Sequence, residues 1–341
     1  MTLISSPEIT SLINTISFYA VSVTVLLALL LDLILGEAKK YHYLVGFGWL
    51  CLQVEELLNP EYNTKTQPSF SLKSAFLGAV SWGVLVLPLP ILYFYFLNDF
   101  VWYWQIALDG VILYLAIGLN SLKQHAMQVY RPLTANNLTS ARHYTGYLVS
   151  RDTKTLTPNE MSRATVESML ENGHDSVIAS IIYYLIGGAP LVILHRFANT
   201  LDAMWGYKNT RYNSFGFASA RLDDMLGFVT AKCCTLLYAL QGAFVNSVKN
   251  ACIQGSRYKS HNGGWVMAAG ATVMNITLGG SANYHGIKTT SVILGCGKAV
   301  TITDIPRSVA LVERAAIMLF ILIFCMQTFS IIVADFLASN P

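Results

Sequence analysis

Long apolar runs separated by polar segments constrain this 341-residue chain more than any other feature of its sequence. Only 12% of its residues are charged, whereas a soluble domain carries roughly 25%. Four runs reach the roughly 20 residues that one membrane crossing needs, and they cover residues 12–35, 74–97, 101–119 and 315–337. We therefore expect an all-α polytopic integral membrane protein, a single domain over 1–341. It would have about four spanning helices, re-entrant or amphipathic helices, and cytoplasmic polar loops.

Two further apolar runs, 177–198 and 225–248, are less typical of membrane crossings. The first contains Gly187-Gly188-Ala189-Pro190, a sequence that favours a broken or re-entrant helix over a straight span. We expect both runs to stay on one side of the membrane.

The distribution of Lys and Arg predicts the orientation of the chain. These residues gather in the large polar segments and are absent from three short ones, 1–11, 98–104 and 338–341. By the positive-inside rule, both termini lie outside and the polar segments face the cytoplasm, with 120–314 as the main cytoplasm-facing region. If both middle runs crossed, four cations would be left outside: Arg196, Lys208, Arg211 and Arg221.

The stretch 199–224 combines carboxylates and cations between two apolar flanks. Its charged residues are Asp202, Lys208, Arg211, Arg221, Asp223 and Asp224. Carboxylates bind Mg²⁺, and Arg and Lys bind phosphate oxygens, so this mixture suits a site for Mg²⁺ and phosphates. The alternative is a salt-bridged surface turn between two helices.

A second polar cluster begins with Thr157-Pro158-Asn159-Glu160, which predicts a helix start with a capping box. The helix that follows places Arg163, Glu167 and Glu171 on one face, and Asn172 and Asp175 extend the polar patch. The alternative is a solvent-facing ladder of ion pairs. A single acid inside the third apolar run, Asp109, is either a polar contact within the bundle or a functional group.

Other classes of protein are disfavoured by composition. The net charge of +3 is too small to indicate nucleic-acid binding. The six cysteines include no CxxC pair, so neither a zinc site nor a disulfide framework is indicated. A transporter would be expected to show inverted repeats, and we find none.

Together these motifs resemble the CobD/CbiB family of cobalamin (vitamin B12) biosynthesis, the membrane-bound adenosylcobinamide-phosphate synthases. The resemblance runs nearly end to end and is most specific between residues 151 and 224. It rests on Leu31-Asp32 through Gly36, Arg151-Asp152-Thr153, Glu167, Glu171-Asn172, Asp175, Asn199-Thr200-Leu201-Asp202, Met204, Gly206-Tyr207-Lys208, Arg211-Tyr212, Phe215-Gly216, Ala220-Arg221-Leu222-Asp223-Asp224, Gly264-Trp265 and Leu278-Gly279-Gly280.

The resemblance implies a ligase of the bacterial cytoplasmic (inner) membrane whose catalytic region faces the cytoplasm. Such an enzyme joins a propionate carboxylate of a corrinoid, adenosylcobyric acid, to aminopropanol or its phosphate, with ATP as substrate and Mg²⁺ as cofactor. Its other partners would be the lipid bilayer and other membrane-associated enzymes of cobalamin assembly.

The same motifs supply candidate residues for each role. Candidate catalytic residues are Glu167, Glu171 and Asp202, and candidate Mg²⁺ ligands are Asp202, Asp223 and Asp224. Candidate residues for binding substrate or phosphate are Arg151, Asn172, Asp175, Asn199, Lys208, Arg211 and Arg221. Five aromatic residues could form apolar walls for the corrinoid: Trp205, Tyr207, Tyr212, Phe215 and Trp265.

The chain also departs from the family pattern. Where the family has Gly-Trp-Pro-Glu-Ala, this chain has Val266 and Met267 and so lacks the carboxylate; Tyr43 and Ser180 each replace a proline. The missing glutamate leaves an alternative function open, a non-catalytic regulatory or sensor protein on the same scaffold.

Overall fold

The computed structural model describes residues 17–36, 43–63, 69–97, 100–284 and 287–339. The helices, in chain order, are α2 (Ala20–Leu35), α3 (Tyr43–Leu58), α4 (Leu72–Val86), α5 (Pro88–Phe96), α6 (Trp102–Ala116), α7 (Leu119–Thr134), α8 (Leu138–Leu148), α9 (Pro158–Asn172), the π-helical turn η1 (Gly173–Ile178), α10 (Ala179–Trp205), α11 (Phe217–Ala239), α12 (Phe244–Ile253), the 3₁₀ turn η2 (Gly255–Arg257), α13 (His261–Met274) and α14 (Asp304–Ser339). The strands are β1 (Ile276–Tyr284), β2 (Ile287–Gly295) and β3 (Lys298–Ala299).

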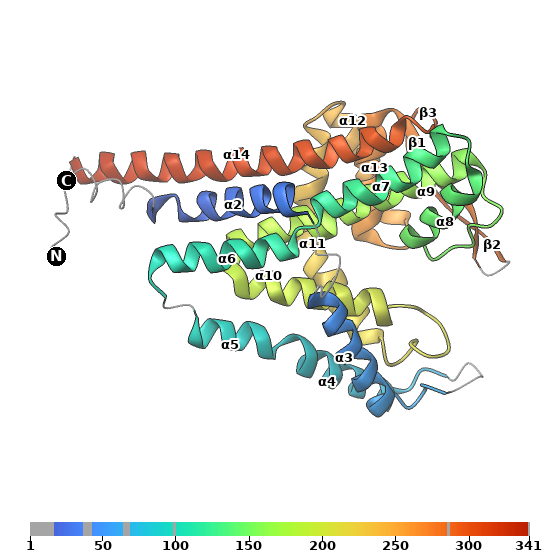
Figure 1. Cartoon of the computed structure of the whole chain (residues 1–341), viewed down its shortest axis with the longest axis horizontal. Helices are drawn as coiled ribbons and strands as arrows, with labels where there is room; N and C mark the ends of the chain where they lie inside the picture. The colour runs from blue at the N-terminus through green and yellow to red at the C-terminus, as the bar shows by residue number, and fades with distance from the viewer. Residues whose placement is uncertain (1–16, 37–42, 64–68, 98–99, 285–286, 340–341) are drawn as a thin grey trace.

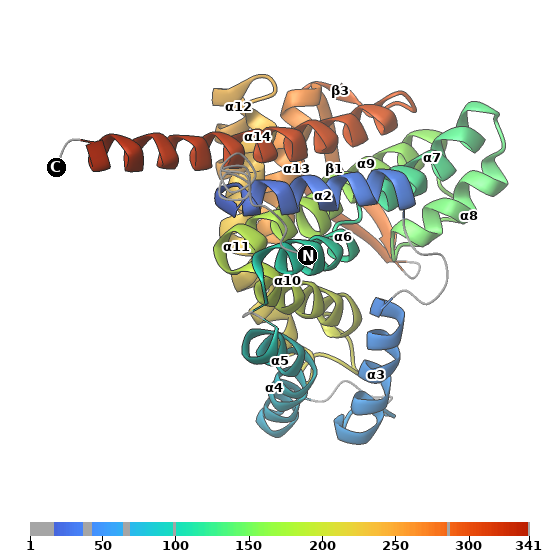
Figure 2. The same cartoon turned by 60° about the vertical axis from the view of Figure 1, so that its left-hand side comes forward.

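Long helices point to one end of the molecule, and shorter elements gather at the other. In Figure 1, α14, α2 and α6 run side by side toward the left, whereas α8, α9, α13 and the strands lie to the right. In both Figure 1 and Figure 2, α3, α4 and α5 form a separate layer next to α10. The arrangement confirms the predicted all-α polytopic membrane class.

Four helices in the described ranges are long and apolar enough to cross a membrane: Leu72–Phe96, Trp102–Thr134, Pro158–Trp205 and Asp304–Leu337. Three of them contain predicted spans to within one residue at the ends, namely 74–97, 101–119 and 315–337. The predicted first span, 12–35, corresponds to α2, a shorter apolar helix of 16 residues, and its residues 12–16 lie outside the described ranges. Large apolar side chains such as Phe329 and Phe336 remain exposed on α14, as a lipid-facing helix requires.

The long helix Pro158–Trp205 folds back on itself at Gly187 and Gly188. Gly188 has φ +65°, a left-handed conformation that glycine adopts at little cost. On either side of this point, the rings of Tyr183 and His195 stack with centroids 4.8 Å apart. Twelve residues of straight helix would separate them by about 18 Å, so the two arms run in opposite directions. The predicted interruption is therefore confirmed, and it has the form of a helical hairpin. Whether this hairpin crosses the membrane or re-enters it stays a prediction.

Asp109 lies in a buried polar cluster that joins α5, α6 and α10. Its carboxylate accepts hydrogen bonds from the hydroxyls of Tyr93 and Tyr184, the latter at 3.0 Å, and from Gln105 Nε2 at 3.0 Å. The structure thus favours the first of the two interpretations of Asp109, a polar contact within the bundle.

We expect Asp109→Leu to destabilise this bundle, because it leaves two buried hydroxyls without their acceptor. The cost of an unsatisfied buried polar group is about 1–3 kcal/mol. A thermal melt in detergent should show a Tm several degrees below that of the wild type. Asp109→Asn, which keeps an acceptor oxygen, should melt much closer to it. Equal melting of the Leu variant and the wild type would contradict this account of Asp109.

Asp32 has a structural contact at the start of α7. It is almost completely buried, and its Oδ2 accepts a hydrogen bond from the backbone nitrogen of Asn120 at 2.9 Å. A carboxylate at this end of a helix satisfies a backbone donor that has no partner within the helix.

A small sheet in the segment 249–314 was not expected from the sequence. β1 and β2 pair antiparallel, β3 pairs parallel with β1, and the strand order is β2-β1-β3. The register of β1 and β2 slips between Leu278 and Gly280, because the single residue Gly279 on β1 lies opposite two residues of β2, Val292 and Ile293. This is a β-bulge, and β2 carries its extra residue.

The start of α9 follows the sequence prediction. The Thr157 side chain accepts from Glu160 N, and Glu160 Oε2 accepts from Thr157 N, so the capping box is complete. This cap fixes the helix whose far end carries Glu171 and Asn172 into the site described next.

Candidate active site

A cleft of about 930 Å³ opens between the end of α9, the returning arm of α10, the loop 206–216, the first half of α11 and the start of α13. It brings together most of the residues predicted from two separate polar segments. Those residues are Glu171, Asn172, Asp175, Asn199, Asp202, Lys208, Arg221, Asp223 and Asp224. The two segments therefore line one cleft. Neither alternative, a salt-bridged surface turn or a solvent-facing ladder of ion pairs, predicts that they meet.

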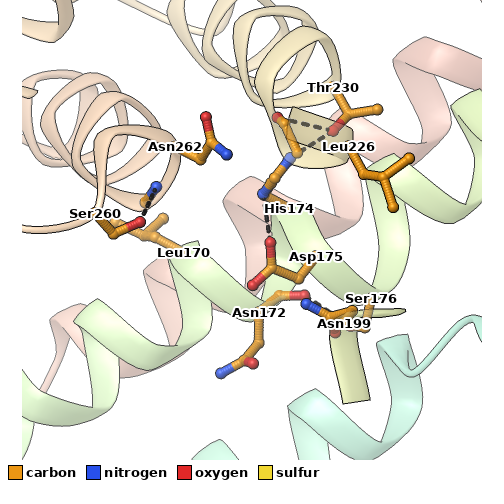
Figure 3. A network of polar contacts seen from close by, with 12 residues as sticks. Leu170, Asn172, His174, Asp175, Ser176, Asn199, Leu226, Thr230, Ser260 and Asn262 are labelled. Atoms are coloured by element: carbon orange, nitrogen blue, oxygen red, sulfur yellow. Dashed lines mark hydrogen bonds and ion pairs between the residues drawn. The ribbon is translucent and has the colours of Figure 1, made fainter. Parts of the chain in front are cut away.

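The helical hairpin that runs from α9 through α10 explains why these residues meet. Because α10 turns back after Gly188, Asn199 and Asp202 on its returning arm lie opposite Asn172 and Asp175 on the incoming one. Figure 3 shows Asn172, Asp175 and Asn199 close together at this point.

The Asp175 side chain is positioned by its neighbour His174. Nδ1 of His174 lies 2.6 Å from Asp175 Oδ1, and its Nε2 lies 2.9 Å from Thr230 Oγ1 (Figure 3). His174 and Thr230 are both buried, whereas Asp175 lines the cleft. The imidazole thus fixes the orientation of the Asp175 carboxylate, which can contact a ligand in the cleft. Residues behind a binding site commonly orient its side chains in this way.

Carboxylates outnumber cations in the cleft. Five acids line it, namely Glu171, Asp175, Asp202, Asp223 and Asp224, against the cations Lys208, Arg221 and Lys259. Burial raises the pKa of the Asp223 carboxyl well above its usual range, and Asp175 and Asp202 raise it further. Crowded carboxylates of this kind favour a bound cation.

The residues present fit Mg²⁺ shared with substrate phosphates. Within the described ranges, no three His, Cys, Asp or Glu side chains are arranged to hold a metal by themselves. Mg²⁺ commonly takes only one or two protein carboxylates and completes its octahedron with phosphate oxygens and water. Asp202, Asp223 and Asp224 offer oxygen ligands of that kind beside Lys208 and Arg221.

Glu171 lies against the N-terminal turn of α13. A methyl group in place of the Gly263 hydrogen would lie 2.3 Å from Glu171 Oε1, so this close approach requires glycine. The start of α13 also supplies Ser260, His261 and Asn262 to the cleft, and Lys259 precedes it. The sequence analysis did not predict these residues as site residues; the glycine at 263, which lets α13 approach α9 closely, is the signal that could have found them.

Three predicted residues have other contacts. Arg151 and Glu167 form a buried ion pair of 2.5 Å outside the cleft, and Glu167 Oε1 also accepts from Gly279 N at 2.8 Å. Arg211 pairs through Nε with the fully buried carboxylate of Glu55, and its guanidinium lies 4.2 Å from the centre of the Tyr62 ring. Through these contacts Arg211 attaches the loop 206–216 to α3. Arg211 is not among the residues that line the cleft, so its predicted contact with phosphate is not supported there.

Of the aromatic residues predicted to form apolar walls, some line the cleft and others are buried in the core. Tyr207 and Tyr212 line the cleft together with Phe70 and Phe217, which were not predicted. Trp205 and Phe215 are instead fully buried against each other, with ring centroids 4.9 Å apart.

Met267 lies away from the cleft. This residue of α13 is 1% exposed in the core, and it is not among the residues that line the cleft. The departure from the family glutamate therefore leaves the set of cleft carboxylates unchanged.

The fold and the cleft define the chain as a polytopic helical membrane protein with an acid-lined site at its polar end. Comparison with known sequences narrows this class. A family profile described as CobD/Cbib protein matches residues 25–312. The chain belongs to the CobD/CbiB family, whose members act in cobalamin biosynthesis.

Individual relatives share much of the sequence. A protein of Chromobacterium violaceum named "Cobalamin biosynthesis protein CobD" is 42% identical over 297 residues, covering 84% of this chain and 91% of the relative. A protein of the same name from Stutzerimonas stutzeri is 39% identical over 308 residues, covering 89% and 98%. One from Halalkalibacterium halodurans is 37% identical over 231 residues, covering 66% and 72%. No solved structure matches the chain.

Proposed function

We propose that this protein is the amide ligase that joins adenosylcobyric acid to aminopropanol or its phosphate, with consumption of ATP. The observation that carries the proposal is the cleft, because it gathers acids, amides and cations from two distant segments. Its acids suit both Mg²⁺ and the ammonium group of an amine substrate. Its cations, Lys208 and Arg221, suit the phosphates of ATP.

The chemistry requires activation of a carboxylate, which is a poor electrophile in water. A propionate oxygen attacks the γ-phosphorus of ATP, the bond to ADP breaks, and an acyl phosphate forms. The amine nitrogen then attacks the acyl carbon, and inorganic phosphate leaves. When bound, Mg²⁺ would neutralise the charge that develops on the transferring phosphoryl group.

Residues of the cleft have distinct roles in this scheme. Asp202, Asp223 and Asp224 would hold Mg²⁺, and Lys208 and Arg221 would hold the phosphates of ATP. Glu171 is the proposed base that removes a proton from the ammonium group, a task for a carboxylate within reach of the amine. Asn172, Asp175 and Asn199 would orient the substrates, and Tyr207 and Tyr212 offer apolar surface to the corrinoid.

The decisive assay uses purified protein with adenosylcobyric acid, aminopropanol phosphate, ATP and Mg²⁺. The proposal requires the amide product and ADP in equal amounts. Binding of the corrinoid without turnover would support the sensor alternative. That alternative rested on Met267, which lies in the core rather than in the cleft.

The proposed orientation places the cleft in the cytoplasm, where ATP is available. Cys296 is exposed in the turn between β2 and β3, in the same polar segment 249–314 that supplies the start of α13 to the cleft. A variant that retains only Cys296 among the six cysteines should react with an impermeant maleimide in inverted membrane vesicles. It should stay unlabelled in intact spheroplasts, because the polar segments face the cytoplasm. Labelling in spheroplasts would contradict this orientation.

A further inference from the structure

A second pocket, of about 240 Å³, lies beside the acid-lined cleft. It is lined by the start of the α8–α9 connection, by α9, by the turn before α13 and by the β-hairpin. Its lining residues are Arg151, Glu167, Tyr258, Lys259, Gly279, Gly280, Thr289 and Ser291. Lys259 also lines the cleft, so the two cavities are neighbours that share this residue.

The charge of this pocket is opposite to that of the cleft. Arg151 and Lys259 line it, and Glu167 is the single carboxylate among its lining residues. A third cation, Arg163, adjoins it: its Nη2 donates to the Ser281 carbonyl at 2.7 Å. A cation-rich pocket of this kind attracts an anion without help from a metal, whereas the acid-rich cleft would repel one.

The hairpin wall brings backbone and hydroxyl groups to the same place. Gly279 has φ +76°, and a methyl group there would lie 2.1 Å from the Val292 carbonyl oxygen, so the bulge requires glycine. Glu167 holds the bulge through Gly279 N and holds Arg151 through its other oxygen. Gly280 adds no side chain that would obstruct a ligand, and Thr289 supplies a hydroxyl from β2. The Ser291 hydroxyl donates to the Gly280 carbonyl at 3.2 Å and so fixes this wall of the pocket.

We infer that this second pocket binds a phosphate group of a substrate, and that it does so without a metal ion. The inference rests on the proposed function, which supplies two sources of such a group, the phosphorylated amine and ATP. Arg and Lys beside hydroxyl donors are the groups that recognise phosphate. A phosphate held here would lie next to the cleft, because Lys259 lines both cavities.

The test is calorimetric titration of the full-length protein in detergent with inorganic phosphate, in the presence of EDTA. Two variants change the pocket. Lys259→Gln removes the shared ammonium group. The double variant Arg151→Gln with Glu167→Gln replaces the buried ion pair by two amides that can still bond to each other and to Gly279. The matched control is Lys298→Gln, which removes the same charge from exposed β3 in the same sheet.

Phosphate should bind in EDTA, and each pocket variant should weaken that binding on the order of tenfold, the effect of one lost charge-assisted hydrogen bond. The Lys298→Gln control should bind phosphate as the wild type does. Absence of metal-independent phosphate binding, or equal loss in the control, would overturn the inference.

Competition then identifies the source of the phosphate. If aminopropanol phosphate displaces inorganic phosphate in EDTA, the pocket holds the amine donor; if ADP displaces it, the pocket holds the nucleotide. Either result supports the pocket as a phosphate site. Because these titrations need no turnover, the pocket can be confirmed even if the ligase assay fails, and the reverse also holds.

Discussion

Asp202→Asn and Glu171→Gln should each reduce the rate of amide formation by at least about 100-fold, the usual range for loss of a general base or of a metal ligand. Both residues line the cleft from opposite arms of the helical hairpin, Glu171 on α9 and Asp202 on α10. Each substitution keeps the shape of the side chain and removes only its charge. Initial rates at saturating ATP and Mg²⁺ provide the measurement.

Two exposed acids serve as matched controls for these variants. Glu56→Gln on α3 and Asp335→Asn on α14 make the same chemical changes at exposed residues that do not line the cleft. They should retain wild-type rates. Near wild-type turnover in both cleft variants would contradict a catalytic role for the two polar segments. It would support the alternative, that they are a structural turn and a ladder of ion pairs.

Asp223→Asn should stabilise the protein in EDTA and abolish most of its stabilisation by Mg²⁺. Burial and two neighbouring carboxylates raise the pKa of Asp223, so the folded state binds its proton more tightly than the unfolded state does. Stability is therefore lost as pH rises from the ordinary Asp pKa, about 4, through the raised value. The neutral amide removes this loss at pH 8.

Thermal melts at pH 8 measure both effects. In EDTA the Asn variant should melt on the order of a few °C above the wild type. Added Mg²⁺ should raise the Tm of the wild type, because a ligand that binds only the folded state stabilises it. The variant should gain much less. An exposed control, Asp152→Asn, should behave as the wild type in both conditions. If Asp223→Asn melts lower in EDTA, or gains as much from Mg²⁺, the assignment of Asp223 to a cation site fails.

Features set by neighbouring residues could be predicted from the sequence. The capping box at Thr157 and Glu160 spans four residues, and the break at Gly187 and Gly188 depends on glycine conformation and the following Pro190. The membrane runs depend only on local hydropathy. In each case the signal and the structure occupy the same short stretch of chain.

Features set by distant partners could not be predicted in this way. Arg211 was interpreted as a phosphate ligand, but Glu55, its partner in the structure, is 156 residues away along the chain. The sheet was missed because β1 contains two consecutive glycines, and its bulge is held by Glu167 from a distant helix. No sequence motif marks Lys259 as a site residue. It lines both cavities only because η2 and α13 fold next to them.

The pair Glu167 and Glu171 shows the same limit within one helix. Their spacing of four residues predicts one shared face, and both were expected to act in catalysis. In the structure Glu171 faces the cleft and Glu167 faces the hairpin pocket. The elements packed around α9, rather than its own periodicity, divide the two carboxylates between two cavities.

The central claim, ATP-driven amide ligation, is tested most directly by following the carboxylate oxygen. Adenosylcobyric acid labelled with ¹⁸O in its free carboxylate is converted in unlabelled water, and the released inorganic phosphate is analysed by mass spectrometry. Ligation through an acyl phosphate predicts one ¹⁸O atom in each phosphate released, together with one amide product. Absence of product, or product accompanied by unlabelled phosphate, would contradict the account.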